Sequence, residues 1–459
     1  MTRKLVIFND SSWNSPQLRS GKRPVTGNAS IAYQCLASED NTGIQQISFL
    51  QGDSRTLPPL TTKIHRLFGT GLHSEILTAY RFLIHNYMSD DEIYLIGAGR
   101  GGFILQCLAD LISISGLLNV ESYSGVSDAY TYSRLTEKAR NGLSGQELRS
   151  KFQSRKVRVK FLGCWDPVGG LGAPTPLLGP LTKLWSEYHS GRVRDGIDNI
   201  YQAFALDETN PRFTPNIMTG TNSESLDAIE QVWFAGTHPN ITGGQRDCRL
   251  SDVALRWLVS KAAHHGLAFD TDKLNDLSTP DPLGSFAEET MPRRLMRLLF
   301  GRKTLRPVAR ADAHFSREQI PGTEKIHASV KTRERKDSHY NPDALAALPP
   351  GSLPVSQDES IPIKSIRQHE RQQVNCPATL LVDSRRLNGN MLDVSEGGAR
   401  IWIPIDLPIG TLVTLRSSLL LDDERNGHVV WAKDQSLGLE FTAEMDLEKL
   451  MPGTQHTLQ

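Results

Sequence analysis

The sequence predicts an α/β protein with a mostly parallel sheet, covered by helices on both faces, and a small antiparallel β-barrel after it. Two observations support this prediction. In the first part of the chain, short apolar runs alternate with stretches of helical length, as in sheets whose parallel strands are joined by helices. After the Pro-, Ser- and acid-rich stretch Leu348–Pro362, short strand-like runs follow one another directly, separated by Asn, Gly, Pro and Asp.

This change in sequence pattern indicates where the domain boundaries lie. We expect an α/β domain over residues 1–347, a linker over 348–362, a barrel over 363–445 and a tail over 446–459. Hydrophobic residues make up 38% of the chain and charged residues 22%, as in a soluble globular protein. Lys+Arg and Asp+Glu both number 51, so the formal net charge is zero. The chain as a whole therefore has no positive electrostatic field that would attract nucleic acid.

The five cysteines are scattered and form no C-x-x-C pair, which indicates free thiols in a reducing compartment. The apolar run near the N-terminus is too short for a signal peptide. We therefore expect a cytoplasmic protein.

The elements of the first domain follow from apolar runs taken in order. Lys4–Asn9 and Ile47–Leu50 suit buried parallel strands. The run Ile93–Ile96 meets a glycine cluster and then a helix over Phe103–Leu118. Later in the chain we expect strands at Val157–Trp165 and Gln231–Gly236, and helices at Tyr201–Glu208 and Leu250–His265.

The stretch Pro292–Arg310 is strongly basic, with Leu, Met and Phe among its arginines. An amphipathic helix that lies on an anionic membrane has this combination of basic and apolar residues. A surface helix that packs one apolar stripe on the sheet is the other interpretation. The second is favoured because the stretch lacks Trp anchors and clean segregation into two faces.

The strand, glycine turn and helix at Ile93–Phe103 resemble the nucleophile elbow of α/β-hydrolases, G-x-S-x-G. Gly97 and Gly101 occupy the outer glycine positions, and Gly99 occupies the position of the serine. A glycine has no side chain that could attack a carbonyl or be activated by a histidine. The elbow is therefore expected without its nucleophile.

Six motifs in residues 1–345 together resemble one α/β-hydrolase family, which includes phospholipase effectors of bacterial type VI secretion. In order, they are Phe8–Asn14 (FNDSSWN), Gly97–Phe103 (GAGRGGF), Phe161–Gly169 (FLGCWDPVG), Ala205–Glu208 (ALDE), Trp233–Gly244 (WFAGTHPNITGG) and Ile326–Val330 (IHASV).

By this resemblance, the remaining catalytic candidates are Asp10, Asp166 and the two histidines His238 and His327, either of which could fill the triad-histidine position. The aspartate of the family's H-x-D motif is Asn240, which carries no charge to stabilise an imidazolium.

No hydroxyl or thiol nearby replaces the missing serine, because Cys107, Ser113 and Ser115 fall inside the following helix. We therefore expect a pseudo-hydrolase rather than an enzyme with a displaced nucleophile. Asp166 and the histidines have no metal-ligand spacing, so a hydrogen-bonded scaffold is expected and no metal.

The second domain carries R-x-x-x-R at Arg367–Arg371 and D-x-S-x-x-G at Asp393–Gly398. These motifs, their order and the all-β texture are similar to the PilZ domain, a bacterial receptor module for cyclic di-GMP. The resemblance implies nucleotide contacts from Arg367, Arg371, Asp393, Ser395 and Gly398.

Arginines pair with phosphate in bidentate fashion and suit the O6 and N7 acceptors of guanine, and a carboxylate can accept hydrogen bonds from the guanine N–H groups. The alternative is that the arginines are solvated linker charges and that Asp393 and Ser395 cap a turn.

The sequence thus predicts a cyclic di-GMP effector that needs no cofactor, in which the barrel senses the nucleotide and the pseudo-hydrolase domain serves as output or as docking surface for a protein partner. The alternative is a nucleotide-regulated phospholipase or esterase of the type VI secretion lipase-like family with a non-standard catalytic site, using Asp10, Asp166 or a bound water. A secretion accessory protein that grips its partner through the inactive domain is a third interpretation.

Overall fold

The structure is a computed structural model, and it divides into two compact units, Met1–Lys364 and Ser365–Gln459. It describes residues 2–10, 19–20, 23–24, 26–52, 72–169, 195–210, 213–219, 228–286, 305–308, 323–346, 348–349, 351–356, 372–383, 385–395, 397–405, 407–408, 410–417, 424–433 and 435–442.

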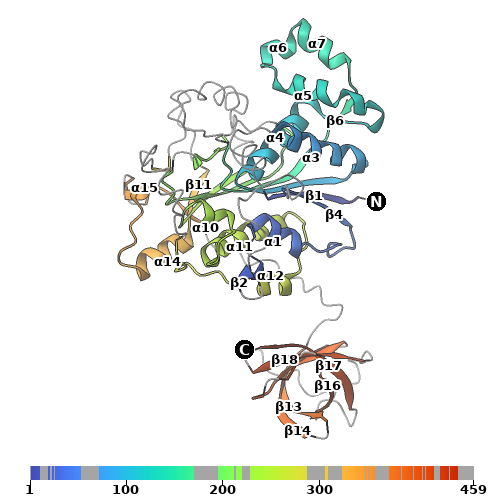
Figure 1. Cartoon of the computed structure of the whole chain (residues 1–459), viewed down its shortest axis with the longest axis vertical. Coiled ribbons are helices and arrows are strands. Elements are labelled where there is room, and N and C mark those ends of the chain that lie inside the picture. Colours follow the sequence, from blue (N-terminus) through green and yellow to red (C-terminus); the bar gives the residue numbers. More distant parts are fainter. Residues whose placement is uncertain are drawn as a thin grey trace. The chain divides into compact units, whose positions relative to one another are not determined.

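The described part of the first unit is built on an eight-stranded sheet in which all neighbouring strands are parallel (Figure 1). Its order is β12 (Val355–Ser356), β11 (Glu324–His327), β10 (Ile229–Phe234), β9 (Ile200–Ala205), β8 (Val159–Trp165), β5 (Glu92–Ala98), β1 (Lys4–Asp10) and β4 (Gln46–Gln51). The central strands are buried along their length, as expected of a sheet covered on both faces.

Helices cover the two faces of this sheet (Figure 1). On one face, α3 (Leu72–Asn86) and α4 (Arg100–Ser115) enclose a core with Leu5, Leu95 and Leu162. On the other face lie α1 (Asn28–Cys35), α10 (His238–Thr242), α11 (Arg249–His264) and α12 (Thr271–Leu277), whose core includes Trp165 and Trp257. Smaller helices follow α4, namely α5 (Val126–Arg134), α6 (Glu137–Asn141) and α7 (Leu143–Ser150).

The sequence-based prediction for Tyr201–Glu208 is wrong, because this stretch forms β9 and not a helix. β9 lies between β8 and β10, and nearly all of its residues are buried, so its two faces do not differ in polarity. Short runs of this kind cannot be assigned to strand or helix by periodicity.

Two further stretches contain elements that were not among the runs named from the sequence. Residues 324–336 form β11 and α14 (Ala328–Lys336), and part of the expected linker forms the edge strand β12.

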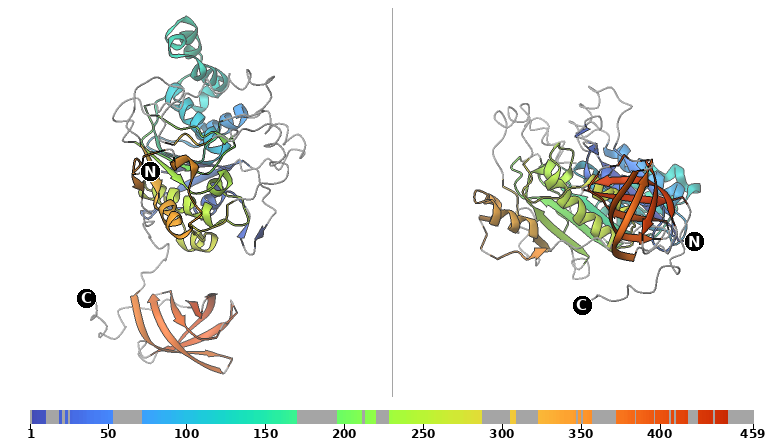
Figure 2. Two further views of the ribbon diagram at one scale, coloured as in Figure 1. Left: turned by 90° about the vertical axis from the view of Figure 1, so that its left-hand side faces the viewer. Right: turned by 90° about the horizontal axis from the view of Figure 1, so that it is seen from below.

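The second unit is a closed antiparallel barrel in the order β13 (Gln372–Val382), β14 (Arg385–Ser395), β15 (Gly398–Trp402), β18 (Ser436–Phe441), β17 (Arg425–Lys433) and β16 (Leu412–Ser417). Figure 2 shows these strands curved into a barrel, and their inward side chains form a small core. Alternate residues point inward, for example Val413 and Leu415 on β16, because side chains alternate along a strand. The α/β sheet and the barrel confirm the predicted fold class.

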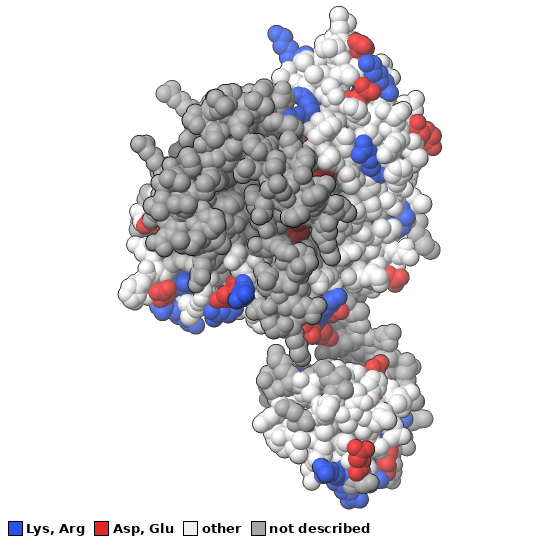
Figure 3. All heavy atoms as spheres, viewed as in Figure 1, with Lys and Arg blue, Asp and Glu red and all other residues white. Residues whose placement is uncertain are grey.

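Charges of both signs are interspersed over the described part of the face drawn in Figure 3. In the stretches of chain that the structure describes, no helix combines the length and the apolar character that crossing a membrane requires. The basic stretch at residues 292–310 falls outside the described residues except for 305–308, which form neither helix nor strand and include the buried Arg306 and Val308.

Candidate functional site

The glycine elbow lies where β5 ends and α4 begins. Gly99, between Ala98 and Arg100, has φ 56° and ψ −122°. The Gly99 N–H donates to the carbonyl oxygen of Trp165 on β8, at 2.8 Å, which fixes the turn. A positive φ with this ψ strains any residue that carries a Cβ, and such strain is typical of the residue that presents a nucleophile. The backbone therefore has the shape of an elbow while the position has no side chain.

His238 faces this position from α10. A Cβ built on Gly99 would lie 3.2 Å from Nε2 of His238, and its next nearest neighbour outside that ring would be Cγ2 of Thr242, at 3.7 Å. A serine at residue 99 would thus carry its hydroxyl next to the imidazole. Of the two histidines considered from the sequence, the structure places His238 at the elbow.

The opposite edge of the His238 ring contacts Asp166, which follows β8. Nδ1 lies 2.6 Å from Oδ2 of Asp166, and the carboxylate is fully buried. Because a carboxylate only accepts, Nδ1 donates, and in the neutral ring Nε2, which lies toward Gly99, carries the lone pair. The histidine and the acid of a catalytic triad are therefore in place, in the orientation that activates a hydroxyl.

Arg306 supports the acid and was not identified as a site residue from the sequence. Its Nη2 lies 2.8 Å from the same Oδ2 of Asp166, and its side chain is 3% exposed. Burial alone would raise the pKa of Asp166, but the charge of Arg306 and the hydrogen bond from His238 outweigh burial and hold the pKa below its usual value. In the sequence Arg306 is one of several arginines in a basic stretch, so no local signal distinguishes it.

The His238 ring is also held from its face and its backbone. Phe213 stacks on it at 4.4 Å between ring centroids, with the planes 13° apart. The His238 N–H donates to Oε2 of Glu208 at 3.1 Å, and the Gly236 N–H donates to Oδ2 of Asp207 at 2.7 Å. The ALDE motif therefore holds the turn that presents the histidine.

In the barrel, two of the expected nucleotide contacts lie at the end of β14. Asp393 and Ser395 are buried, and Oγ of Ser395 donates to the carbonyl oxygen of Gly398 at 3.2 Å. A Cβ on Gly398 would clash with the carbonyl oxygen of Leu439 on β18. The glycine is thus required by the close approach of two strands. Arg367 and Arg371 fall outside the described residues.

Comparison with known families decides what the first unit is. Residues 3–261, more than half of the chain, match the family described as the catalytic domain of Tle1-like phospholipase effectors of type VI secretion (T6SS). The chain belongs to this family. Residues 365–451 match the PilZ domain. Both resemblances noted in the sequence are confirmed, and the two units are called the Tle1-like domain and the PilZ domain below.

Individual relatives are distant. The uncharacterized protein YEL023C of Saccharomyces cerevisiae is 28% identical over 136 residues, which are 28% of this chain and 20% of the yeast protein. The PilZ domain of CeSA from a cellulose-synthesizing bacterium is 22% identical, with a TM-score of 0.15, over 17% of this chain and 86% of that one. The Tle1 effector bound to the VgrG spike is 16% identical, with a TM-score of 0.31, over 53% of this chain and 51% of the other.

Asn240 of the Tle1-like domain does not have the role that its place in the H-x-D motif suggested. Its Oδ1 accepts from the N–H and the hydroxyl of Thr237, at 3.1 and 2.9 Å, and so caps α10. The carboxylate that contacts the imidazole is Asp166. An asparagine at residue 240 therefore leaves the His238–Asp166 pair intact.

The other two remnant candidates, His327 and Asp10, end two different strands of the Tle1-like sheet, and Asp10 pairs in register with Ala98 beside the elbow. His327 ends β11, its Nδ1 contacts Oγ of Ser329 at 2.8 Å, and its ring stacks on Phe234. Asp10 ends β1, next to the elbow strand, and its Oδ2 accepts from the N–H of Ser30 at 3.0 Å, in the first turn of α1. These contacts give both residues structural roles.

The hydroxyls and thiols near the elbow in sequence are inside α4, as expected. Cys107 is buried, which raises the pKa of its thiol well above the usual value, and Oγ of Ser115 donates to the carbonyl oxygen of Ala129. Among the residues that the structure describes, no group of His, Cys, Asp and Glu side chains could hold a metal ion.

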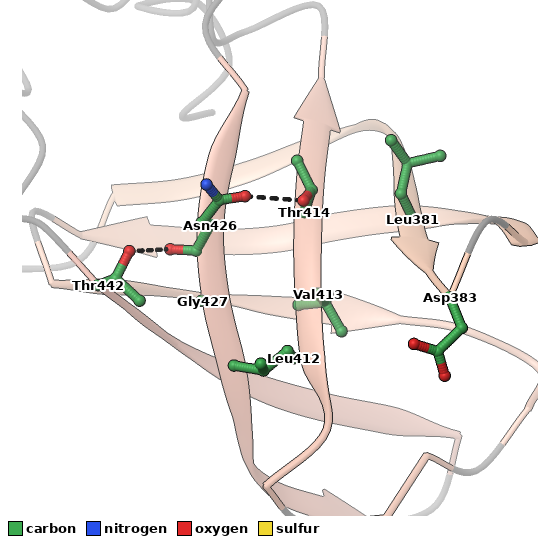
Figure 4. A pocket seen from close by; sticks show the side chains of 8 residues that line it. All are labelled: Leu381, Asp383, Leu412, Val413, Thr414, Asn426, Gly427 and Thr442. Atoms are coloured by element: carbon green, nitrogen blue, oxygen red, sulfur yellow. Dashed lines mark hydrogen bonds between the residues drawn. The ribbon is translucent and has the colours of Figure 1, made fainter.

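The PilZ domain also has a shallow hollow of about 330 Å³ on its wall, where β13, β16 and β17 pack side by side (Figure 4). Leu381, Leu412 and Thr414 border it, and Oγ1 of Thr414 donates to Oδ1 of Asn426 at 2.7 Å. Of the residues expected to contact the nucleotide, the three that the structure describes, Asp393, Ser395 and Gly398, do not line this hollow.

Proposed function

We propose that the chain is a cyclic di-GMP effector in which the PilZ domain binds the nucleotide and the Tle1-like domain acts as a pseudo-hydrolase that serves as output or docking surface. The observation that carries the proposal is Gly99, a residue without a side chain, at a fully formed elbow that His238 faces. Acyl transfer by a serine hydrolase requires an oxygen at that position.

The sensing half of the proposal depends on five residues. Arg367 and Arg371 would supply bidentate hydrogen bonds to phosphate and guanine. Asp393 would accept from guanine N–H groups, with Ser395 beside it at the end of β14. Gly398 would act indirectly, by allowing β15 to approach β18 closely.

Isothermal titration calorimetry of the full chain with cyclic di-GMP tests the sensing. We expect saturable binding that is lost in the double variant Arg367→Ala/Arg371→Ala. Arg385→Ala/Arg386→Ala is the matched control, because this exposed pair lies at the start of β14 and Asp393 and Ser395 lie at its end. Normal binding by the first double variant would remove the proposed site.

We also propose that nucleotide binding changes which protein the Tle1-like domain contacts. Ordering of the segment around Arg367 and Arg371 on the nucleotide would supply a disorder-to-order switch. The Tle1 relative bound to a VgrG spike supports a secretion protein as the partner. A pull-down with and without cyclic di-GMP tests this. A partner captured equally under both conditions would contradict regulation of partner binding by the nucleotide.

The compartment is part of the same proposal. The five cysteines are scattered along the sequence with no C-x-x-C pair, which supports a reducing environment such as the cytoplasm. The proposal needs no cofactor and no metal.

A second candidate function is a slow lipid or ester hydrolase. The intact His238–Asp166 pair favours it, because this pair is able to activate a water. It predicts turnover of p-nitrophenyl esters by the native chain that disappears in Asp166→Ala. If the native chain turns over these esters no faster than Asp166→Ala does, the result favours the pseudo-hydrolase.

A further inference from the structure

The hollow on the PilZ barrel opens on the outer wall and has an apolar side. Side chains alternate along β16, so Leu412 and Thr414 point outward while Val413 and Leu415 point into the core. Leu412 lines the hollow and is 73% exposed, and Leu381 on β13 lines it as well. An exposed leucine at a concave surface favours a group that covers it, because burial removes apolar area from water.

The chain leaves the barrel at the rim of this hollow. Thr442 follows β18 and lines the hollow, and both its N–H and its Oγ1 donate to the carbonyl oxygen of Asn426, at 2.9 and 3.0 Å (Figure 4). Leu412 pairs with His428, which is two residues along β17 from Asn426, a rise of about 7 Å. The residues that follow Thr442 therefore start close to Leu412.

Residues 443–459 lie outside the described residues, and their sequence suits an apolar surface with a carboxylate at its rim. The apolar residues near their start are Met445, Leu447, Leu450 and Met451. An extended chain advances about 3.3 Å per residue, so Met445 can lie up to about 10 Å from Thr442, and the later residues further. Lys449 is the only lysine or arginine in this stretch, and Asp383 lines the hollow. An exposed ion pair between them would contribute little energy but would favour one register.

We propose that the segment after Thr442 covers the hollow of its own barrel, with its apolar side chains packed on Leu412 and Leu381. A segment attached at the rim has a high effective concentration at the hollow, which a second copy of the chain lacks. The inference does not depend on nucleotide binding, because β16 and β17 are not neighbours of β14 or β15 in the barrel.

Trypsin tests the proposal in the full chain, because cleavage after Lys449 releases a peptide that begins at Leu450. A segment that lies on the barrel cannot enter a protease, so the cleavage rate reports how often the segment is released. Mass spectrometry of the released peptide should show cleavage about tenfold faster or more in Leu412→Asp than in the native chain. Leu143→Asp is the matched control and should keep the native rate, since Leu143 is 86% exposed on α7 of the Tle1-like domain.

A change in the segment itself should have the same effect. Leu447→Ser should accelerate release of the peptide, and Leu412→Asp/Leu447→Ser should accelerate it no further than Leu412→Asp, because both changes remove the same contact. Synthetic peptides of residues 443–459, with and without the serine, give the intrinsic cleavage rates. Cleavage after Arg400, which is paired on both sides in β15, reports unfolding of the barrel and should be equal in all variants.

Three results would overturn the proposal. The first is equal release from the native chain and from Leu412→Asp, and the second is release from the native chain as fast as cleavage of the free peptide. The third is protection of the native chain that disappears on dilution, which would assign the hollow to a second copy of the chain.

Discussion

Arg306 contacts Asp166 through Nη2 and Oδ2, 2.8 Å apart, with both side chains buried and His238 on the same carboxylate oxygen. Such an arrangement is unstable without the cation, because a buried carboxylate needs compensating charge. Its persistence beside an elbow that lacks a nucleophile shows that the supporting part of the site remains built when the attacking oxygen is absent.

Replacing Arg306 by Met should destabilise the Tle1-like domain by about 3–5 kcal/mol at neutral pH, the usual cost of leaving a buried charge unpaired. Asp166 has a lowered pKa in the folded state, so its contribution to stability is present above the unfolded pKa of about 4 and is lost as the pH falls through the folded value. Urea unfolding at several pH values should therefore show a difference between the native chain and the variant that shrinks under acidic conditions.

The matched control is Arg158→Met, which breaks the partly exposed pair with Asp198. It should change the free energy of unfolding by about 1 kcal/mol or less. An effect of Arg306→Met no larger than this would contradict the role given to Arg306.

Asp207 should make the native chain less stable as the pH rises from about 4 to about 6. Burial raises the pKa of Asp207 to about 6, so the folded state holds its proton more tightly than the unfolded state does in this interval. The loss is on the order of 2–3 kcal/mol. Asp207→Asn keeps an oxygen that can accept from Gly236 and Tyr340 and should lack this loss.

Urea unfolding at pH 4.5 and pH 7 measures this difference, with the exposed Asp276→Asn as the control. Parallel pH dependence in the native chain and Asp207→Asn would show that Asp207 is not the group responsible.

Gly398→Ala should destabilise the barrel, because the added methyl group would clash with the carbonyl oxygen of Leu439. Overpacking of this kind costs roughly 1–3 kcal/mol. Thermal unfolding should show a lower transition for the PilZ domain with that of the Tle1-like domain unchanged, and cyclic di-GMP should bind more weakly. Unchanged barrel stability with weaker binding would instead indicate that Gly398 contacts the nucleotide directly.

Much of the fold could be predicted because buried parallel strands are continuous apolar runs. Lys4–Asn9 became β1, and the strand–glycine–helix at Ile93–Phe103 became β5 and α4. The same property caused the error at Tyr201–Glu208, since a short run buried on both faces has no period that identifies it as a strand.

The candidate site was predictable only where a motif carries it. Gly99 could be identified because the elbow pattern fixes its position, whereas Arg306 could not, because its role depends on a contact with a residue 140 positions away. The choice between His238 and His327 also required the structure, since both lie at or just after the carboxyl end of a strand of one sheet. Asn240 shows the reverse case, in which a motif position suggests chemistry and the side chain caps a helix.

The most direct test of the central claim, that the Tle1-like site lacks one oxygen and little else, is the activity of Gly99→Ser on p-nitrophenyl esters. We expect turnover to rise roughly a hundredfold or more over the native chain, below the ~10⁶-fold that loss of a serine nucleophile costs an evolved enzyme. The strained φ and ψ at residue 99 should cost the variant about 1–3 kcal/mol of stability.

Gly99→Ala should gain nothing, and Gly99→Ser/Asp166→Asn should lose most of the gain, because Asp166 orients His238. Fluorophosphonate labelling should appear only in the variants with serine at residue 99. A folded Gly99→Ser variant that neither turns over esters nor takes the label would contradict the claim.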